Sequence, residues 1–212
     1  MGAPVEIIDL NGVGDARGPR LLDVVVGGVS SLERWCWWFG HVAVGWRSQA
    51  GWVDVTALAR SLLEPVPAHR TLGIQVVRAG DGCGEVMVET PLSMTNVIGS
   101  LHSSGLIALV DAAGLAAIIG ACAAGDDVGG VVPLGAVASL DFRAPARGRL
   151  TASCRLDPGT RRALRPVLAG AEDRARVTTV ADIVDREGVL VCRGTFDWSV
   201  RRYPTVVTPI AD

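Results

Sequence analysis

The chain has 212 residues, 49% of them hydrophobic, which is enough apolar material for a folded protein with a sizeable core. The formal net charge of −2 leaves no basic excess to bind a phosphate backbone, so we expect no nucleic-acid partner. All 20 basic residues are arginine, which excludes mechanisms that need a lysine, such as Schiff-base formation.

Five cysteines stand at positions 36, 83, 122, 154 and 192, an odd number without any Cys-x-x-Cys pair. This pattern predicts neither a disulfide framework nor a zinc site. His41, His69 and His102 show no ligand spacing, so no metal or redox cofactor is implied. Reduced thiols, and a start without a basic stretch followed by an apolar one, favour a cytoplasmic location.

Residues 1–52 differ from the rest and are interpreted as a Gly/Trp-rich N-terminal extension, with the folded domain over 53–212. The extension holds nine glycines and six of the ten aromatic residues, with no helical or strand periodicity. Three interpretations remain open: a poorly ordered segment, a contact with a partner or a membrane surface, and upstream sequence included by a misassigned start, with the true start at Val53. We favour the last two over a folded domain.

The first regular element predicted is a short helix over residues 55–64. Asp54 is a residue type that caps helix N-termini, and Pro65 and Pro67 are expected to end the helix. Two strands follow over 72–79 and 84–90.

A turn at Asp81-Gly82 is expected to join these two strands as a hairpin. In the second strand, valines alternate with Glu85, Met87 and Glu89, which predicts one buried and one solvated face.

The second half begins with a long apolar helix over 103–124. Its length would suit a membrane span, but Asp111 near its middle would cost roughly 2.5–3.5 kcal/mol in lipid. A buried helix without a membrane span is therefore expected. Four strands follow, over 131–143, 149–156, 176–185 and 188–200, with a turn at 185–188 and a helical insert at 160–170.

This order of elements predicts an α+β fold in which a curved antiparallel sheet wraps around one long central helix. That arrangement is the hotdog fold. In the last strand one face carries mostly apolar residues and glycine, from Leu190 to Trp198, and the other carries Arg193, Thr195 and Asp197.

The stretch that could carry chemistry runs from Asn96 into the apolar helix. A polar, turn-forming segment leads up to the helix, whose first backbone N–H groups are free to bind a developing oxyanion. Asp111 lies about two turns further on and is the only charged residue between His102 and Ala124. A lone carboxylate in such surroundings suits a general base or nucleophile.

Each of these residues also has a structural interpretation, which the pattern alone leaves open. Asp111 could be a buried, hydrogen-bonded structural carboxylate. His102 could be a helix N-cap or a packing residue, and Asn96 a turn residue.

The spacing Asn-x-x-Gly-x-x-His, followed nine residues later by Asp111 on an apolar helix, resembles the PaaI-type acyl-CoA thioesterases of the hotdog superfamily. The resemblance covers about Leu58 to Arg201. It includes the segment from Val132 to Gly148, which is similar to the third strand and following turn of that family. The segment Phe196–Arg201 is similar to its closing strand.

The resemblance implies a thioester hydrolase without a cofactor, in which Asp111 is the general base or nucleophile. Asn96 would orient the water or the carbonyl, the Ser103 amide would polarise the carbonyl oxygen, and His102 would support the loop. It further implies a homodimer or homotetramer, with Asp111 from one subunit and Asn96 with its loop from the other. The substrate would be an acyl-CoA or an acyl-carrier-protein thioester.

Substrate contacts are expected at five further positions: Gly99, Ser104, Gly135, Arg143 and Arg147. For Arg143, Arg147 and the nearby Arg149, a contact with a CoA phosphate and a merely solvated rim remain equal alternatives. The family usually has Gly-Gly after the histidine, where this chain has Ser103-Ser104. If the amide there required a positive φ, serine would fit it less well than glycine.

Two other functions remain as alternatives. A hotdog dehydratase or hydratase would use histidine with an acidic residue in a different arrangement, and the Gly-Asp-x-Asn-Pro type of signature is absent. A non-catalytic acyl-CoA-binding protein would result if the Ser-Ser pair had weakened catalysis.

Overall fold

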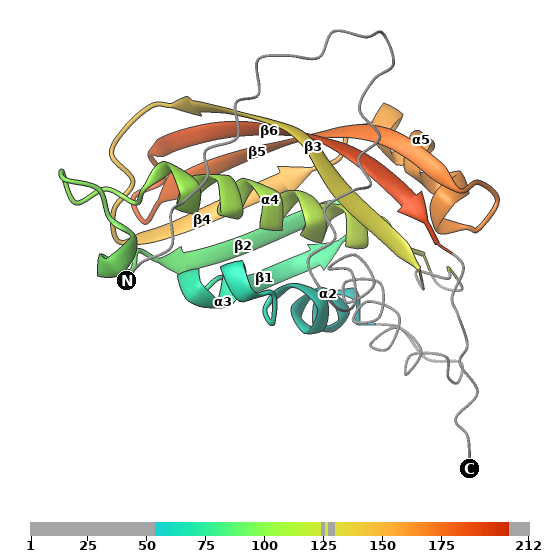
Figure 1. Ribbon diagram of the computed structural model, residues 1–212, viewed down its shortest axis with the longest axis horizontal. Coiled ribbons are helices and arrows are strands. Elements are labelled where there is room, and N and C mark those ends of the chain that lie inside the picture. Colours follow the sequence, from blue (N-terminus) through green and yellow to red (C-terminus); the bar gives the residue numbers. More distant parts are fainter. Residues whose placement is uncertain (1–53, 124–125, 127–129, 204–212) are drawn as a thin grey trace, which may run out of the picture.

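Figure 1 shows the computed structural model, which describes residues 54–123, 126 and 130–203. The predicted extension over residues 1–52 lies outside this described part. The elements are, in chain order, α2 (Val55–Leu63), α3 (Pro67–Leu72), β1 (Gln75–Gly80), β2 (Cys83–Glu89), the 3-10 helix η1 (Leu92–Met94), α4 (Ser103–Ile119), β3 (Val131–Phe142), β4 (Arg149–Arg155), α5 (Pro158–Leu168), β5 (Arg174–Asp185) and β6 (Leu190–Arg202).

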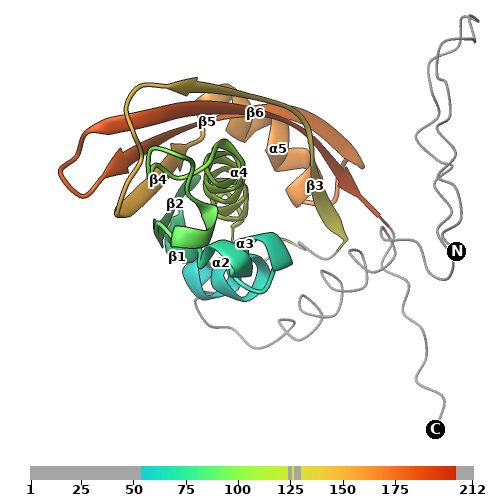
Figure 2. The same ribbon diagram turned by 60° about the vertical axis from the view of Figure 1, so that its left-hand side comes forward.

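The six strands form one sheet in the order β1-β2-β4-β5-β6-β3, and every neighbouring pair is antiparallel. The sheet curves around α4, and α2 and α3 lie on the side of α4 away from β5 and β6 (Figures 1 and 2). The predicted arrangement of a curved antiparallel sheet around one long helix is therefore confirmed.

Helix α4 lies in the core because it is apolar on nearly every side. Glycines in the strands, which have no Cβ atom, let α4 approach the sheet closely. A Cβ atom on Gly84 of β2 would come within 2.4 Å of the Ala117 nitrogen of α4, and one on Gly194 of β6 within 2.5 Å of a Val110 methyl group. Among the residues that the structure describes, no helix is both long and apolar enough to span a membrane.

The predicted C-terminal end of this helix at residue 124 is wrong, because α4 ends at Ile119. The helix stops where it meets the hairpin of β1 and β2. The Gly82 amide donates to the Gly120 carbonyl at 2.8 Å, and a Cβ on Gly120 would lie 2.6 Å from the Cys83 oxygen.

The predicted helix over 55–64 is confirmed as α2, and the Asp54 side chain caps it by accepting from the Ala57 amide. Helix α3 was not predicted. The sequence pattern gives the prolines only as the end of the preceding helix, but Pro67 is the first residue of α3, where proline needs no N–H partner. Gly73, with a φ of 73°, ends α3, so the strand predicted from residue 72 begins at Gln75 instead.

The two edges of the sheet differ. Along β1, side chains of α2 bond to the strand's backbone: Arg60 donates to the Val76 oxygen, Glu64 accepts from the Val76 amide, and the Thr56 hydroxyl bonds to both backbone groups of Ala79. At the other edge, no strand of the described chain pairs with the outer side of β3. Helix α2 thus covers one edge and leaves the other open.

Candidate active site

Asp111 lies in the middle of α4, on the part of the helix that the sheet does not enclose. Its side chain is 28% exposed, and Ile107, one turn earlier on the same face, is 40% exposed. The rest of the helix around it is largely buried. Asp111 is thus a carboxylate in apolar surroundings that solvent can still reach.

One oxygen of Asp111 bonds to a histidine that the sequence did not mark as a site residue. His69 of α3 is 2% exposed, and its Nε2 lies 3.3 Å from Asp111 Oδ2. Its Nδ1 lies 2.8 Å from the Leu63 carbonyl oxygen at the end of α2. Helix α3, seen beside α4 in Figure 2, therefore brings a buried imidazole to the candidate catalytic carboxylate.

Asn96 organises the loop that leads to α4. Its side-chain Oδ1 accepts from the backbone amides of Ile98 and Ser100, both at 3.1 Å. Its backbone amide donates to the Ser100 carbonyl. Gly99 has a φ of 71°, a conformation that favours glycine. Within the described chain Asn96 therefore acts as a turn residue, which is the structural interpretation left open above.

The loop is held from outside by Arg147, whose guanidinium donates to the Ile98 carbonyl at 2.6 Å. Two apolar side chains of the loop are exposed: Val97 is fully exposed, and Ile98 is 56% exposed. The loop is thus held by several hydrogen bonds and carries apolar surface that the described chain does not cover.

His102 is the N-cap of α4. Its Nδ1 accepts from the Ser104 amide at 3.2 Å and lies 2.9 Å from the Ser104 hydroxyl. No hydrogen bond in the described part of the chain uses the Ser103 amide, which leaves it available to a substrate oxygen. Outside glycine, Asp81 is the one described residue with a positive φ, so Ser103 and Ser104 in place of glycines carry no backbone strain.

The single chain does not bring all the predicted site residues together. Asp111 follows Ser103 by eight residues, which is about 12 Å along a helix at roughly 1.5 Å per residue. No hydrogen bond or ion pair between described residues joins Asp111 to the loop. Apart from Asp111, the predicted site residues are all exposed: Asn96, Gly99, His102, Ser103, Ser104, Gly135, Arg143 and Arg147.

Gly135 and Arg143 lie on or after β3. A Cβ on Gly135 would come within 2.4 Å of the Phe196 ring, so glycine here makes room for that aromatic side chain. Arg143 forms an exposed ion pair with Asp141. In the described chain neither residue contacts Asp111.

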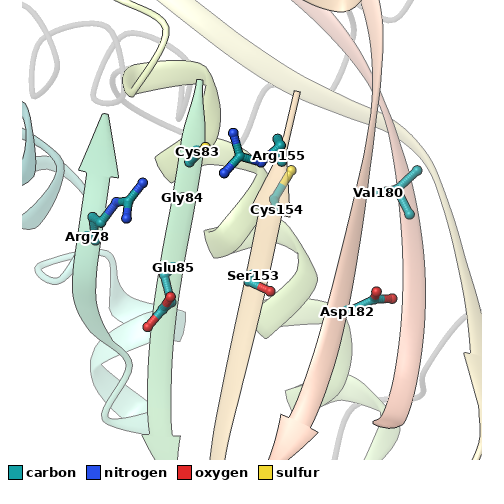
Figure 3. A pocket seen from close by; sticks show the side chains of 9 residues that line it. All are labelled: Arg78, Cys83, Gly84, Glu85, Ser153, Cys154, Arg155, Val180 and Asp182. Carbon is teal, nitrogen blue, oxygen red and sulfur yellow. The ribbon is translucent and has the colours of Figure 1, made fainter. Parts of the chain in front are cut away.

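A hollow of about 360 Å³ lies on the other face of the sheet, across β1, β2, β4 and β5 (Figure 3). Its charged lining residues are Arg78, Glu85, Arg155 and Asp182. The hydrogen bond from Arg193 holds the pKa of the Asp182 carboxyl below its usual range. None of the predicted site residues lines this hollow.

A model of the family described as "Domain of unknown function (DUF4442)" matches residues 56–200. No curated protein matches the chain.

Solved structures resemble the chain at low sequence identity. A Pseudomonas aeruginosa protein of unknown function, described as a probable thioesterase, is 23% identical with a TM-score of 0.57, over 70% of this chain and 96% of that one. A protein from the thioesterase superfamily is 22% identical with a TM-score of 0.52, over 69% and 98%. The Escherichia coli PaaI protein from the phenylacetic acid degradation operon is 17% identical with a TM-score of 0.48, over 78% and 96%. The first two likenesses confirm the predicted hotdog fold.

Proposed function

Because the chain belongs to the DUF4442 family and has the hotdog fold, we propose that it hydrolyses an acyl thioester with Asp111 as general base or nucleophile. The observation that carries this proposal is the partly exposed carboxylate in the middle of an apolar central helix. The descriptions of two solved structures with this fold, a probable thioesterase and a thioesterase-superfamily protein, support the same reaction class.

As a general base, Asp111 takes a proton from water while the water oxygen bonds to the thioester carbonyl carbon. The C–S bond then breaks, and the proton passes to the departing sulfur, which gives a carboxylic acid and a thiol. As a nucleophile, the carboxylate itself bonds to the carbonyl carbon and the thiolate leaves, after which water cleaves the resulting anhydride. The Ser103 amide at the start of α4 stabilises the carbonyl oxygen in both routes.

The site requires a second copy of the chain, since Asp111 and the Ser103 amide of one chain lie about 12 Å apart along α4. Residues of the partner loop, from Asn96 to Ser104, would complete the site around Asp111. The open edge of β3 and the exposed Val97 and Ile98 support a homodimer, because no strand of the described residues pairs with that edge and both valine and isoleucine are apolar.

The substrate in this proposal is an acyl-CoA, with an acyl-carrier-protein thioester as the alternative donor of the same acyl group. Arg147 stands beside the loop and keeps donors beyond the one it gives to Ile98, which suits a CoA phosphate. Gly99 and Ser104 would lie against the thioester and Gly135 and Arg143 at the rim of the site.

Replacing Asp111 by Asn tests the proposal. The amide cannot accept the proton or attack the carbonyl, so kcat for thiol release from a panel of acyl-CoAs should fall by about 10²–10⁴-fold. Circular dichroism and the oligomeric mass should not change. The matched control is Glu172→Gln, at an exposed residue in the turn between α5 and β5, which should keep wild-type turnover.

Wild-type turnover in Asp111→Asn would refute the hydrolase mechanism. If the wild-type protein binds acyl-CoA saturably but releases no thiol, the chain is a binding protein instead. Conversion of enoyl or 3-hydroxyacyl thioesters without thiol release would identify a hydratase or dehydratase.

A further inference from the structure

His69 and Asp111 form a hydrogen-bonded pair in which the histidine is buried and the carboxylate is partly exposed. The side chain of His69 is 3% exposed, whereas that of Asp111 is 28% exposed. In the described chain no other charged side chain forms an ion pair with either residue. Asp111 Oδ2 points inward to Nε2, and Oδ1 bonds to no described residue. Oδ2 is thus fixed by His69, while Oδ1 has no hydrogen-bond partner among the described residues.

The hydrogen bonds of the ring determine how many protons the pair holds. The Leu63 carbonyl can only accept, so His69 Nδ1 must carry a proton and donate it at 2.8 Å. If Nε2 had no proton, its lone pair would face an ionised carboxylate at 3.3 Å, which is repulsive. Acceptors thus face both ring nitrogens, which points to one further proton between Nε2 and Oδ2.

The position of the ring favours this proton on the nitrogen. Leu63 is the last residue of α2, and its carbonyl belongs to the negative end of that helix. The imidazole is thus held between a helix C-terminus on one side and a carboxylate on the other. Both partners stabilise a positive charge, and a buried imidazolium requires such pairing.

We propose that His69 is a positioning residue, held as an imidazolium, that keeps Asp111 ionised with Oδ1 turned toward the substrate. This inference rests on the proposed hydrolase function for its catalytic consequence. The buried cation offsets the cost of placing a carboxylate in an apolar helix. It also fixes the side chain in one orientation, so that the reacting oxygen needs no rearrangement before it meets water or the thioester.

Nitrogen-15 NMR of the histidine rings tests the charge state without any substrate. In the wild-type protein at neutral pH, both nitrogens of His69 should carry protons, and in Asp111→Asn the Nε2 proton should be lost. An unprotonated Nε2 in the wild-type protein would overturn the proposal. Substitution of His69 assigns its signals among the three histidines of the chain.

Two variants of His69 test the positioning role in the full-length protein. In His69→Asn the side-chain amide nitrogen takes the place of Nδ1. It keeps the hydrogen bond to the Leu63 carbonyl, but no donor reaches Asp111. This variant should lower kcat about 10- to 100-fold with KM within about two-fold of wild type. In His69→Gln the amide reaches the Nε2 position and donates to Oδ2, and it should recover several-fold of that loss. Arg70→Gln, the next and exposed residue of α3, should leave kcat unchanged.

These measurements separate a failure of this inference from a failure of the proposed function. Wild-type kcat in a folded His69→Asn protein overturns the positioning role, even where Asp111→Asn is inactive. Conversely, His69 could prove doubly protonated while the Asp111→Asn variant keeps full turnover. That result would support the charged pair and refute the hydrolase mechanism.

Discussion

Buried polar side-chain atoms in the described part of the molecule all have hydrogen-bond partners, and some of those partners lie on distant elements. The Trp198 indole donates to the Thr179 hydroxyl at 2.8 Å, from β6 to β5. His69 bonds at both ring nitrogens in the same way, to α2 and to α4. Single residues thus connect the elements around α4, and removing one partner leaves a buried polar group unsatisfied.

Cys154 of β4 illustrates how burial alone changes the chemistry of a residue. Burial raises the pKa of its thiol from the ordinary 9.0 to about 12. The unfolded chain releases this proton near pH 9, whereas the folded protein keeps it until about pH 12. The contribution to stability is therefore complete below pH 9 and is lost as the pH rises toward 12.

We accordingly expect the free energy of unfolding to fall by about 1 kcal/mol between pH 8 and pH 10 because of Cys154. Urea unfolding of the wild type and of Cys154→Ala at both pH values measures this effect. The variant lacks the thiol, so its fall should be smaller by that amount. An equal fall in both proteins would contradict the prediction.

How far the sequence could predict these residues depends on how local their interactions are. The Asp54 cap and the Asp81-Gly82 turn involve neighbours in the chain, and both were predicted correctly. The contact of His69 with Asp111 spans 42 residues and depends on α3, a helix that the sequence pattern does not predict. No spacing rule relates two such positions, so only the fold reveals the pair.

At the scale of the elements, close contact between α4 and the strands depends on glycines. At Gly84 a Cβ would lie 2.4 Å from the Ala117 nitrogen and 2.6 Å from the Ala113 oxygen. Both are backbone atoms of α4, so they cannot move without shifting the helix. Asp111 lies on the same helix, and its position therefore depends on this contact.

Gly84→Ala should consequently lower the free energy of unfolding by about 1–3 kcal/mol, as other overpacked cores do. Urea denaturation at pH 7 measures the change. Gly80→Ala is the matched control on the neighbouring strand, because a Cβ there would meet no atom within 4 Å. Equal stability of the two variants would mean that α4 does not approach β2 as closely as described.

The sequence predicted the type and order of most elements better than their ends. The insert predicted at 160–170 is α5, which begins at Pro158 because Asp157 caps it through the Gly159 and Thr160 amides. The alternation in β2 is confirmed, with Val86 and Val88 buried and Glu89 exposed. Apolar character alone did not mark the end of α4, which is set by its contact with the hairpin of β1 and β2.

At the scale of the whole molecule, the two edges of the sheet differ within the residues that the structure describes. Polar side chains of α2 bond to the edge at β1, whereas the outer side of the 12-residue strand β3, where Val137 is 60% exposed, pairs with no other strand of the described chain. The loop from Asn96 to Ser104 adds exposed apolar side chains. Open edges of this kind pair readily with another chain, which is why most proteins cover them.

From this asymmetry we predict that the protein is a dimer, with a mass of at least twice the 22.1 kDa chain, and that β3 forms the contact. Val137→Arg would place like charges near each other across a two-fold axis, which destabilises strand pairing. It should convert the dimer to a folded monomer and abolish thiol release, since the partner loop is then missing from the site.

Val189→Arg, at an exposed valine between β5 and β6, should change neither property. Light scattering after size-exclusion chromatography, with thioesterase assays on the same fractions, measures both effects. A wild-type monomer with full activity would show that one chain completes the site, contrary to the separation of Asp111 from Ser103 along α4.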